Sequence, residues 1–187
     1  GVTSLVVWLL NHCPCPLVLD ADALNALAQA IRQKRWSATG AAGATGGVPE
    51  TSAVGSADGF VRVLTPHLGE YRRLQSACDA STGGTTDDKI DSDSAVIELA
   101  KKLGCWLVLK GPQTRITDGN VMWRNQTGNP GLATGGSGDC LTGVMVACLA
   151  SRSSTSLALR RACFVHGLAG DLAAADLGQH AMNAEDL

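Results

Sequence analysis

The chain has 187 residues, of which 45% are hydrophobic and 17% charged, and its formal net charge is −2. This length allows one domain with a substantial core. The net charge is close to zero, so the composition indicates no basic surface for nucleic acid. The longest apolar run near the beginning, Leu5 to Leu10, is too short to cross a bilayer and lacks the cationic leader of a signal peptide. We therefore expect neither a nucleic-acid nor a membrane partner.

The first part of the chain combines short apolar segments with helix signals. Residues 3–12 predict a helix, and residues 17–19 predict a short buried strand that ends at Asp20. Asp22 is a predicted cap for a helix with apolar residues at helical spacing, namely Leu24, Leu27, Ala28 and Ile31. Because the chain begins at Gly1 rather than Met, inside a predicted helix, we expect a fragment or a processed product.

The middle of the chain alternates polar and apolar stretches. Residues 37–59 are rich in Gly, Ala, Ser and Thr without apolar periodicity, which predicts a flexible surface insertion. Residues 61–64 predict a strand and residues 69–77 a helix. The polar residues 79–92 predict a loop, and a helix is expected over residues 94–103.

The last part of the chain begins with a continuous apolar run over residues 106–109, which is typical of a central parallel strand. Residues 114–117 and 120–123 predict a hairpin around Asp118-Gly119. A glycine-rich loop then leads into a predicted buried helix that starts near Gly138. A long final helix is expected over residues 157–177.

This alternation predicts an α/β protein in which helices cover both faces of a mostly parallel sheet, a three-layer α/β/α sandwich. In such sheets, sites form at the carboxyl ends of the strands. The chemistry-bearing residues follow predicted strands or open predicted helices: Asp20, Asp22, His67, Glu70, Lys110, Thr114 and Asp139. We therefore expect them to share one edge of the sheet.

The glycine-rich loop over residues 129–139 predicts a phosphate site. A loop that runs into a helix in this way leaves backbone N–H groups free and directs the positive end of the helix dipole at one place. Asp139 lies in the same place, where a base could take the proton of a hydroxyl about to attack a phosphoryl group. The alternative is that Asp139 only stabilises the helix dipole.

Two further clusters suit the same chemistry. Lys110 could neutralise phosphate at the end of a strand, with Gly111 allowing close backbone approach; an exposed turn is the alternative. His67 and Glu70 stand at a strand-to-helix junction, where Glu70 could orient water around Mg²⁺. The alternatives are a hydrogen-bonded turn residue for His67 and a dipole partner for Glu70. Asn25 is expected either at the edge of the site or bonded to its own turn.

The remaining candidate ligands predict structural roles. His166 lies in the apolar face of the last helix and is expected to be a satisfied core histidine. The seven cysteines show no zinc-like spacing. Cys13 and Cys15 lie near His12 without a further ligand, so we expect no metal there. The other five are expected to be small core residues in a reducing, cytosol-like compartment: Cys78, Cys105, Cys140, Cys148 and Cys163.

Four motifs stand in one order along the chain. They are Leu19-Asp20-Ala21-Asp22-Ala23-Leu24-Asn25, Leu64-Thr65-Pro66-His67-Leu68-Gly69-Glu70, Val108-Leu109-Lys110-Gly111-Pro112-Gln113-Thr114 and the stretch 127–143, which contains Gly135-Gly136-Ser137-Gly138-Asp139. Together they resemble the ADP/ATP-dependent NAD(P)H-hydrate dehydratases of the ribokinase-like superfamily. The resemblance spans nearly the whole chain apart from residues 37–59.

The resemblance implies repair of NADHX and NADPHX, the hydrated forms of NADH and NADPH. It further implies that a phosphoryl group of ADP or ATP moves to the ring hydroxyl and that phosphate is then eliminated. Asp139 matches the family's catalytic acidic residue at the substrate hydroxyl, and we assign His67 and Asn25 with it to substrate binding. The histidine form of the His67 motif favours ADP as the donor.

The resemblance also implies a nucleotide site and an anion hole. The nucleotide-binding residues are Lys110, Gly111, Pro112, Gln113, Thr114, Gly135, Gly136, Ser137 and Gly138, the last four forming the anion hole. Mg²⁺ is expected as a cofactor, with Glu70 contacting the ion through a water molecule. The chain departs from the usual pattern at Leu68, where the family usually has Pro, and at Pro112 inside the Lys-Gly stretch.

Family domains carry a further N-terminal part that faces the same site, so we expect residues 1–187 to be the C-terminal portion of a single ribokinase-like domain. The leading hypothesis is the dehydratase, and the Asn129-Pro130-Gly131 stretch and the His67 motif favour it. The alternatives are a ribokinase-like kinase of a thiazole, pyrimidine or sugar, and a catalytically incomplete nucleotide-binding fragment. We expect a homo-oligomer in the cytoplasm, with an organellar form left open.

Overall fold

The computed structural model describes residues 1–37, 61–82, 92–151 and 153–187. Its helices are α1 (Val2–His12), α2 (Asp22–Arg32), α3 (Leu68–Thr82), α4 (Asp93–Leu103), α5 (Ser137–Ala150) and α6 (Thr155–Leu177), with short 3₁₀ helices η2 (Pro130–Leu132) and η3 (Ala184–Asp186). Within these ranges no helix is both long and apolar enough to span a bilayer. Apart from Ser37, the predicted insertion over residues 37–59 lies outside the described residues.

The described strands are β1 (Leu17–Leu19), β2 (Arg62–Leu64), β3 (Trp106–Leu109), β4 (Arg115–Thr117) and β5 (Met122–Arg124), in the sheet order β1-β2-β3-β4-β5. The pairs β1–β2 and β2–β3 are parallel, and β3–β4 and β4–β5 are antiparallel. The mostly parallel sheet and the hairpin are confirmed. β5 starts later than predicted because the Asp118 carboxylate accepts hydrogen bonds from the backbone N–H groups of Asn120 and Val121, which keeps both in the turn.

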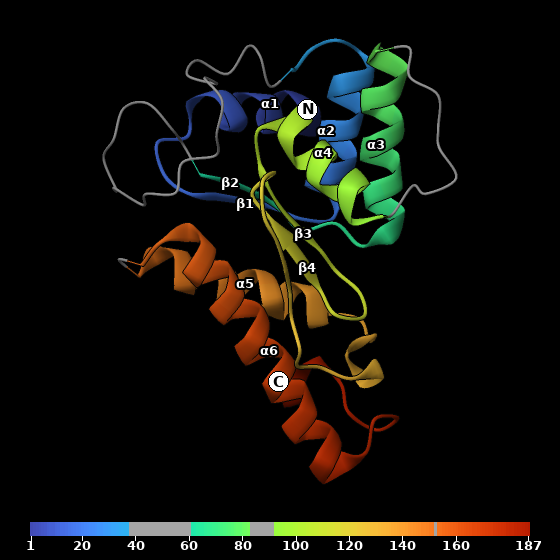
Figure 1. Cartoon of the computed structure of the whole chain (residues 1–187), viewed down its shortest axis with the longest axis vertical. Helices are drawn as coiled ribbons and strands as arrows, with labels where there is room; N and C mark the ends of the chain where they lie inside the picture. Colours follow the sequence, from blue (N-terminus) through green and yellow to red (C-terminus); the bar gives the residue numbers. More distant parts are fainter. Residues whose placement is uncertain (38–60, 83–91, 152) are drawn as a thin grey trace.

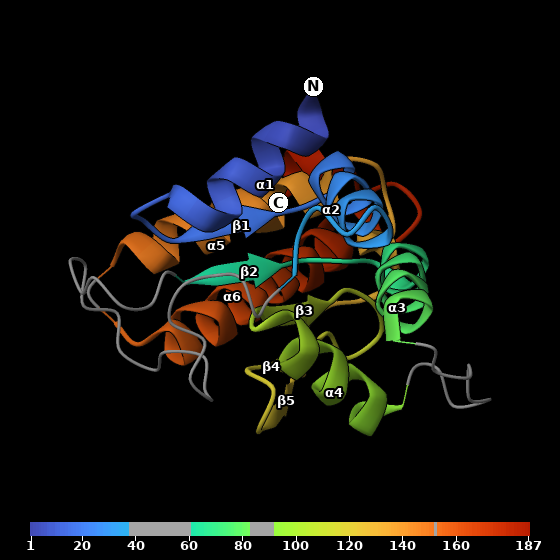
Figure 2. The ribbon, with the colours of Figure 1, turned by 90° about the horizontal axis from the view of Figure 1, so that it is seen from above.

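Helices cover both faces of the sheet, as Figures 1 and 2 show: α1 to α4 lie on one face, and α5 and α6 lie on the other. Alternation along the strands creates these two interfaces. In β3, Leu107 and Leu109 join the core beneath α1 to α4, whereas Trp106 and Val108 join the core above α5 and α6. A strand buried on both faces has to be apolar throughout, so the three-layer arrangement is confirmed and its cause is visible in the sequence.

Two helix ends differ from prediction. The N-cap residue of α2 is Ala21 rather than Asp22, and Asp22 is the first helical residue. Ala21 has a φ of 47°, in the left-handed region that a non-glycine residue seldom adopts. The helix α3 continues to Thr82, beyond the expected end near Ala77. The helix can extend this far because residues 70–82 contain no glycine or proline that would break it.

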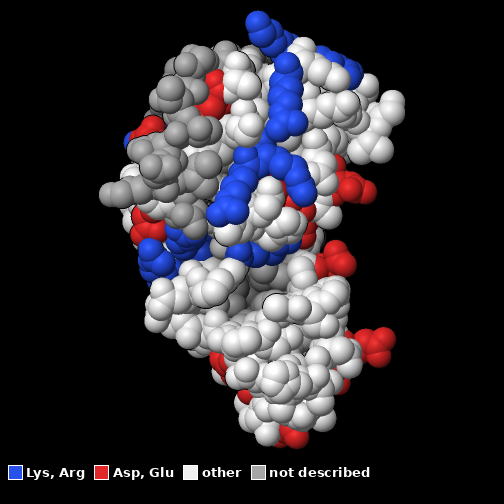
Figure 3. All heavy atoms as spheres, turned by 90° about the vertical axis from the view of Figure 1, so that its right-hand side faces the viewer, with Lys and Arg blue, Asp and Glu red and all other residues white. Residues whose placement is uncertain are grey.

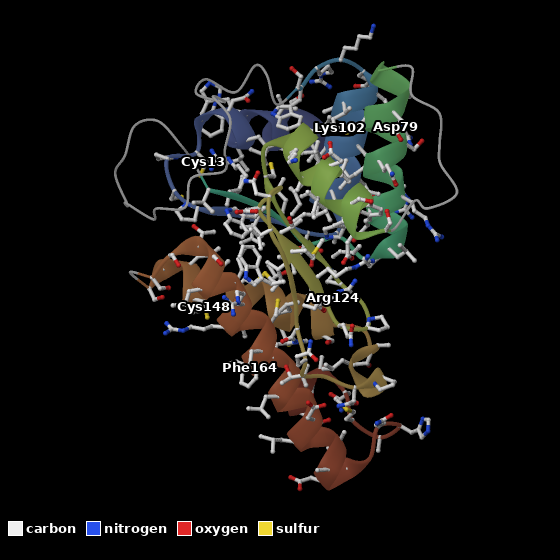
Figure 4. The ribbon with its side chains drawn as sticks, viewed as in Figure 1. Cys13, Asp79, Lys102, Arg124, Cys148 and Phe164 are labelled. Carbon is white, nitrogen blue, oxygen red and sulfur yellow. The ribbon has the colours of Figure 1, made fainter. Side chains whose placement is uncertain are left out.

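The helix α5 is buried along one stripe only, although its apolar composition predicted a buried helix. Leu141, Met145 and Leu149 repeat every four residues and face the core, whereas Val146 is 53% exposed. The helix α6 likewise leaves Phe164 half exposed, and Figure 4 shows its ring pointing away from the sheet. The described structure therefore carries an apolar surface on the outside of α5 and α6.

Candidate nucleotide and substrate site

The carboxyl ends of β1, β2 and β3 meet at one edge of the sheet because these strands are parallel. Asp20, His67 and Lys110 lie just beyond those ends. Pairing continues there, since His67 and Lys110 form an isolated parallel bridge and the Lys110 N–H donates to the Pro66 carbonyl at 2.8 Å. The sheet topology thus brings the predicted strand-end residues to one edge.

An ion pair holds the Lys110 side chain. Its Nζ lies 2.7 Å from Asp20 Oδ1, and the two side chains are only 20% and 12% exposed. The Asp20 carboxylate also accepts hydrogen bonds from Thr142 Oγ1 at 3.1 Å and from the Ala21 backbone N–H at 2.9 Å. One carboxylate therefore connects the ends of β1 and β3 to α5, and the unusual backbone of Ala21 belongs to the same cluster.

The N-terminus of α5 is open beside this cluster. Its N-cap residue is Gly136, with a φ of 88°, and no side chain of the described residues caps the first turn. A Cβ at Gly138 would lie 3.2 Å from Lys110 Nζ and 3.8 Å from Asp20 Oδ2, so the missing side chain lets the ammonium reach the helix end. Free backbone N–H groups, the helix dipole and an ammonium converge there, which suits a phosphate.

Asp139 lies in the first turn of α5, and its side chain is exposed. Across residues 1–37, 61–82, 92–151 and 153–187, no hydrogen bond or ion pair engages its carboxylate. A carboxylate at this position stabilises the helix dipole whatever else it does. Because none of the described residues occupies this carboxylate, it is also available to a ligand at the helix end.

The pair His67 and Glu70 forms the start of α3. His67 Nδ1 accepts hydrogen bonds from the backbone N–H groups of Gly69 at 2.9 Å and Glu70 at 3.4 Å. This pattern assigns the ring hydrogen of neutral His67 to Nε2, which lies 3.4 Å from Glu70 Oε1. Glu70 Oε2 accepts from the His67 backbone N–H at 2.9 Å. The buried Glu70 therefore orients an imidazole whose side chain remains 55% exposed.

The stretch Lys110–Thr114 is an exposed turn between β3 and β4. Thr114 Oγ1 donates to the Gly111 carbonyl at 3.2 Å, and Gln113 has a φ of 53°. Gly111, Pro112 and Gln113 are exposed, whereas Lys110 is partly buried. An exposed turn is the alternative that the sequence left open for the Lys110 cluster. This turn also leaves backbone groups accessible next to the Lys110 ammonium.

Asn25 lies on an exposed turn of α2, where its Oδ1 accepts a hydrogen bond from Arg73 Nη1 of α3 at 3.1 Å. Figure 3 views the side of the molecule on which α3 lies and the strands end. Lys and Arg side chains gather in its upper half, and the surface below them is hollowed. The lower half of that view carries few basic side chains. This distribution favours an anionic ligand near the strand ends.

Hydrogen bonds connect the loop before α5 to α6. The sequence did not predict these contacts. Asn129 Nδ2 donates to Asp171 Oδ1 at 3.1 Å, and Asp171 Oδ2 accepts from the Gly128 N–H at 2.9 Å. His166 Nε2 lies 2.9 Å from the Ser137 carbonyl, so the predicted core histidine is confirmed. Burial lowers the pKa of His166, and its hydrogen bond to the Ser137 backbone opposes this shift.

A metal ion at this edge would depend on the nucleotide. In the described part of the chain, no three His, Cys, Asp or Glu side chains are grouped so as to hold a metal. Mg²⁺ in nucleotide sites is usually held by one or two carboxylates together with phosphates and water. Glu70 supplies a carboxylate beside the strand ends, but its side chain is only 7% exposed and both of its oxygens contact His67. The residues therefore fit a Mg²⁺ ion that arrives with phosphates and contacts Glu70 through water, not one that Glu70 ligates directly.

Comparison with known proteins agrees with these features. A family model described as NAD(P)H-hydrate dehydratase matches residues 52–187. The bifunctional NAD(P)H-hydrate repair enzyme Nnr of Moorella thermoacetica is 40% identical over 191 residues, which cover 100% of this chain and 30% of that protein. The chain thus spans less than a third of the length of this curated relative.

Two solved structures are similar to the chain. An ADP/ATP-dependent NAD(P)H-hydrate dehydratase from Bacillus subtilis, co-crystallised with ATP/Mg²⁺ and soaked with CoA, has a TM-score of 0.64 and 29% identity, with 92% of this chain and 53% of that chain covered. A ribokinase-like superfamily protein from Enterococcus faecalis has a TM-score of 0.65 and 23% identity, with 92% and 51% covered. The second comparison shows the fold alone, which is ribokinase-like as expected.

Proposed function

Since the chain belongs to the NAD(P)H-hydrate dehydratase family, we propose that its site serves the ADP- or ATP-dependent dehydration of NADHX and NADPHX back to NADH and NADPH. The observation that carries the proposal is the convergence at Gly138, where the Lys110 ammonium meets the N-terminus of α5 beside Asp139, whose carboxylate bonds to none of the described residues. A cation, free N–H groups and a carboxylate at one point are what phosphoryl transfer to a hydroxyl requires.

In this proposal the transferred phosphoryl group rests on residues 135–138, and Lys110 neutralises its charge. The Asp139 carboxylate takes the proton of the ring hydroxyl as the hydroxyl oxygen bonds to phosphorus and the nucleotide leaves. Phosphate is then lost from the ring together with a proton from the neighbouring carbon, which restores the double bond. Asp20 takes no part in bond changes; it holds Lys110 through the ion pair of 2.7 Å.

The other assigned residues form the surrounding walls. His67 presents its exposed ring to the hydrated nicotinamide, oriented by Glu70. Asn25 contacts the substrate at the rim with its amide nitrogen, because its oxygen is already bonded to Arg73. The exposed turn from Gly111 to Thr114 receives the remainder of the nucleotide.

Mg²⁺ would be bound to the phosphates, with Glu70 as the protein carboxylate acting through water. When bound, the ion neutralises phosphate charge during transfer. We propose ADP as the preferred donor, on the basis of the histidine in the His67 motif.

The test uses protein expressed from the complete reading frame that contains these 187 residues. It is incubated with NADHX or NADPHX, Mg²⁺ and either ADP or ATP, while the absorbance of the reduced nicotinamide is followed. Recovery of NADH or NADPH with at least one nucleotide supports the proposal, and no recovery with either one refutes it. A stable phosphorylated product without elimination would instead identify a small-molecule kinase.

We also propose a cytoplasmic homo-oligomer. The free cysteines fit a reducing compartment, and the exposed apolar side chains of α5 and α6 favour a covered surface. Light scattering combined with size-exclusion chromatography tests the assembly, and a monomer at micromolar concentration would contradict it.

A further inference from the structure

Two thiols meet at the connection between α1 and β1, where Cys13 follows the helix and Cys15 precedes the strand. Their Sγ atoms are 3.3 Å apart. Cys13 is half-buried and Cys15 is exposed. Figure 4 shows Cys13 at the end of α1. Because Asp20 follows the opposite end of β1, this thiol pair is separate from the candidate nucleotide and substrate site.

A buried arginine restrains both cysteines. Arg62 in β2 is 5% exposed, and its guanidinium donates to the carbonyl of Cys13 at 2.8 Å and to that of Cys15 at 3.2 Å. It also donates to the Leu10 carbonyl of α1 at 3.1 Å. Pro14 stands between the cysteines, and its ring restricts the backbone. The two side chains are therefore held next to each other by the fold.

The surroundings give the two thiols different acidities. A hydrogen bond with the Cys15 backbone lowers the pKa of Cys13, and the Cys15 side chain and the Arg62 charge add to this effect against the opposing effect of burial. The hydrogen bond of its thiol with Cys13 raises the pKa of Cys15. The thiolate is the nucleophile in disulfide exchange, so the lower pKa favours Cys13 as the attacking thiol and Cys15 as the resolving one.

We propose that Cys13 and Cys15 are a redox modification site that closes to an intrachain disulfide when the protein meets a small-molecule disulfide such as oxidised glutathione. The pair has the proximity that exchange requires, since its sulfur atoms must approach from 3.3 Å to a bond length of about 2.05 Å. No third ligand-bearing side chain of the described residues is grouped with them, which favours thiol chemistry over a metal ion.

The exchange conserves atoms and electrons. The Cys13 thiolate attacks one sulfur of glutathione disulfide, forms a mixed disulfide and releases one glutathione thiolate, which takes up the Cys15 proton. The Cys15 sulfur then attacks the Cys13 sulfur and releases the second glutathione thiolate, which is protonated by solvent. The cysteine pair loses two electrons, and glutathione disulfide gains them.

The test exposes the protein from the complete reading frame to oxidised or reduced glutathione, followed by acid quenching, alkylation with iodoacetamide under denaturing conditions, trypsin digestion and mass spectrometry. Between Gly1 and Arg32 the chain contains no other Lys or Arg and no other cysteine, so one peptide reports on the pair. We expect this peptide to escape alkylation and to be lighter by two hydrogen atoms after oxidation, and to be restored by dithiothreitol.

Internal controls come from the buried thiols of Cys78 and Cys105, whose pKa values burial raises to about 11 and about 12. These should remain reduced and be alkylated in the same digest. Cys13→Ser and Cys15→Ser should each leave one thiol that forms at most a mixed disulfide. In the wild-type protein at neutral pH, limiting iodoacetamide should alkylate Cys13 faster than Cys15, which fragmentation of the shared peptide in the mass spectrometer distinguishes.

Two results would overturn the proposal. The first is a wild-type peptide that keeps two alkylated thiols, or carries two glutathione adducts, once exchange has reached equilibrium. The second is closure of the buried control thiols under the same conditions, since oxidation would then reflect unfolding rather than this thiol pair. The reverse order of alkylation rates would overturn the assignment of Cys13 as the attacking thiol.

Discussion

Replacing Gly138 with alanine tests whether the open end of α5 binds phosphate. The added Cβ would lie 3.2 Å from Lys110 Nζ and 3.8 Å from Asp20 Oδ2. The first contact is tighter than usual, but its partner is the end of a flexible side chain, so the ammonium can move by a few tenths of an ångström. The methyl group would nevertheless occupy the space in which a phosphate would contact both the Lys110 ammonium and the helix N–H groups.

The structure sets the size of both effects. A hydrogen bond to a charged group contributes about 1.5–3 kcal/mol, so losing the Lys110 contact should weaken ADP binding about 10- to 100-fold. Stability should change by less than about 1 kcal/mol, because alanine favours helix while the new contact opposes it. The matched control is Gly143→Ala in the same helix, where a Cβ would meet no atom of the described residues within 4 Å. This control should gain up to about 1 kcal/mol and bind ADP normally.

Titration calorimetry with ADP and Mg²⁺ measures ADP binding, and urea denaturation of the same preparations measures the free energy of unfolding. The expected pattern is loss of binding without loss of stability in Gly138→Ala, and neither loss in Gly143→Ala. If Gly138→Ala binds ADP as tightly as the wild type, the phosphate does not rest on the start of α5. If Gly138→Ala unfolds, a shift of Lys110 does not relieve the Cβ contact.

Asp139→Asn should keep the fold and nucleotide binding but lose turnover by about 10²–10⁴-fold in the NADH-recovery assay, because a positioned base is removed; near-normal turnover would exclude Asp139 from the mechanism. Lys110→Ala should raise the nucleotide concentration needed for half-maximal rate, since a charge-assisted contact is lost, and unchanged affinity would make Lys110 a turn residue only. Met145→Ala, at a site with no exposed surface, should lower the free energy of unfolding by about 2–5 kcal/mol in urea denaturation. The control is Val146→Ala, at the exposed residue next to Met145, which should change the free energy of unfolding by about 0.5 kcal/mol or less. Equal losses of stability in the two variants would contradict the one-sided burial of α5. Because the folded-state pKa of His166 lies below its ordinary value of 6.5, the unfolded chain binds the proton more readily, and stability should fall as pH drops below 6.5. His166→Gln should lessen that fall, and an identical pH dependence in this variant would show that other groups cause it.

The elements of this protein follow largely from local signals in the sequence. The apolar run Trp106–Leu109 predicted a strand buried on both faces, and β3 contributes to both cores. The glycine-rich stretch before α5 predicted an uncapped helix start. These predictions succeed because burial on both faces and positive φ angles select residue types at single positions, independent of distant parts of the chain.

Predictions failed where a neighbouring element decides the outcome. The sequence of α5 is apolar nearly all round, yet only one stripe is buried, because the described structure packs the helix against the sheet from one side. Asp22 has the residue type of a helix cap, but Ala21 occupies that position while the preceding Asp20 is held by Lys110 and Thr142. A tertiary contact that fixes the backbone overrides the preference of a residue type for a helix position.

By itself, the sequence determined the order of strands and helices and the family of the chain, and it predicted a phosphate site in the loop over residues 129–139. Only the tertiary structure decided that Asp20 holds Lys110 across 90 residues and Thr142 across 122, and that Cys13 and Cys15 are restrained by Arg62. Sequence patterns record what each segment requires locally. Which carboxylate meets which cation depends on how parallel strands bring distant chain segments to one edge, and that is settled only when the sheet and its helices pack together.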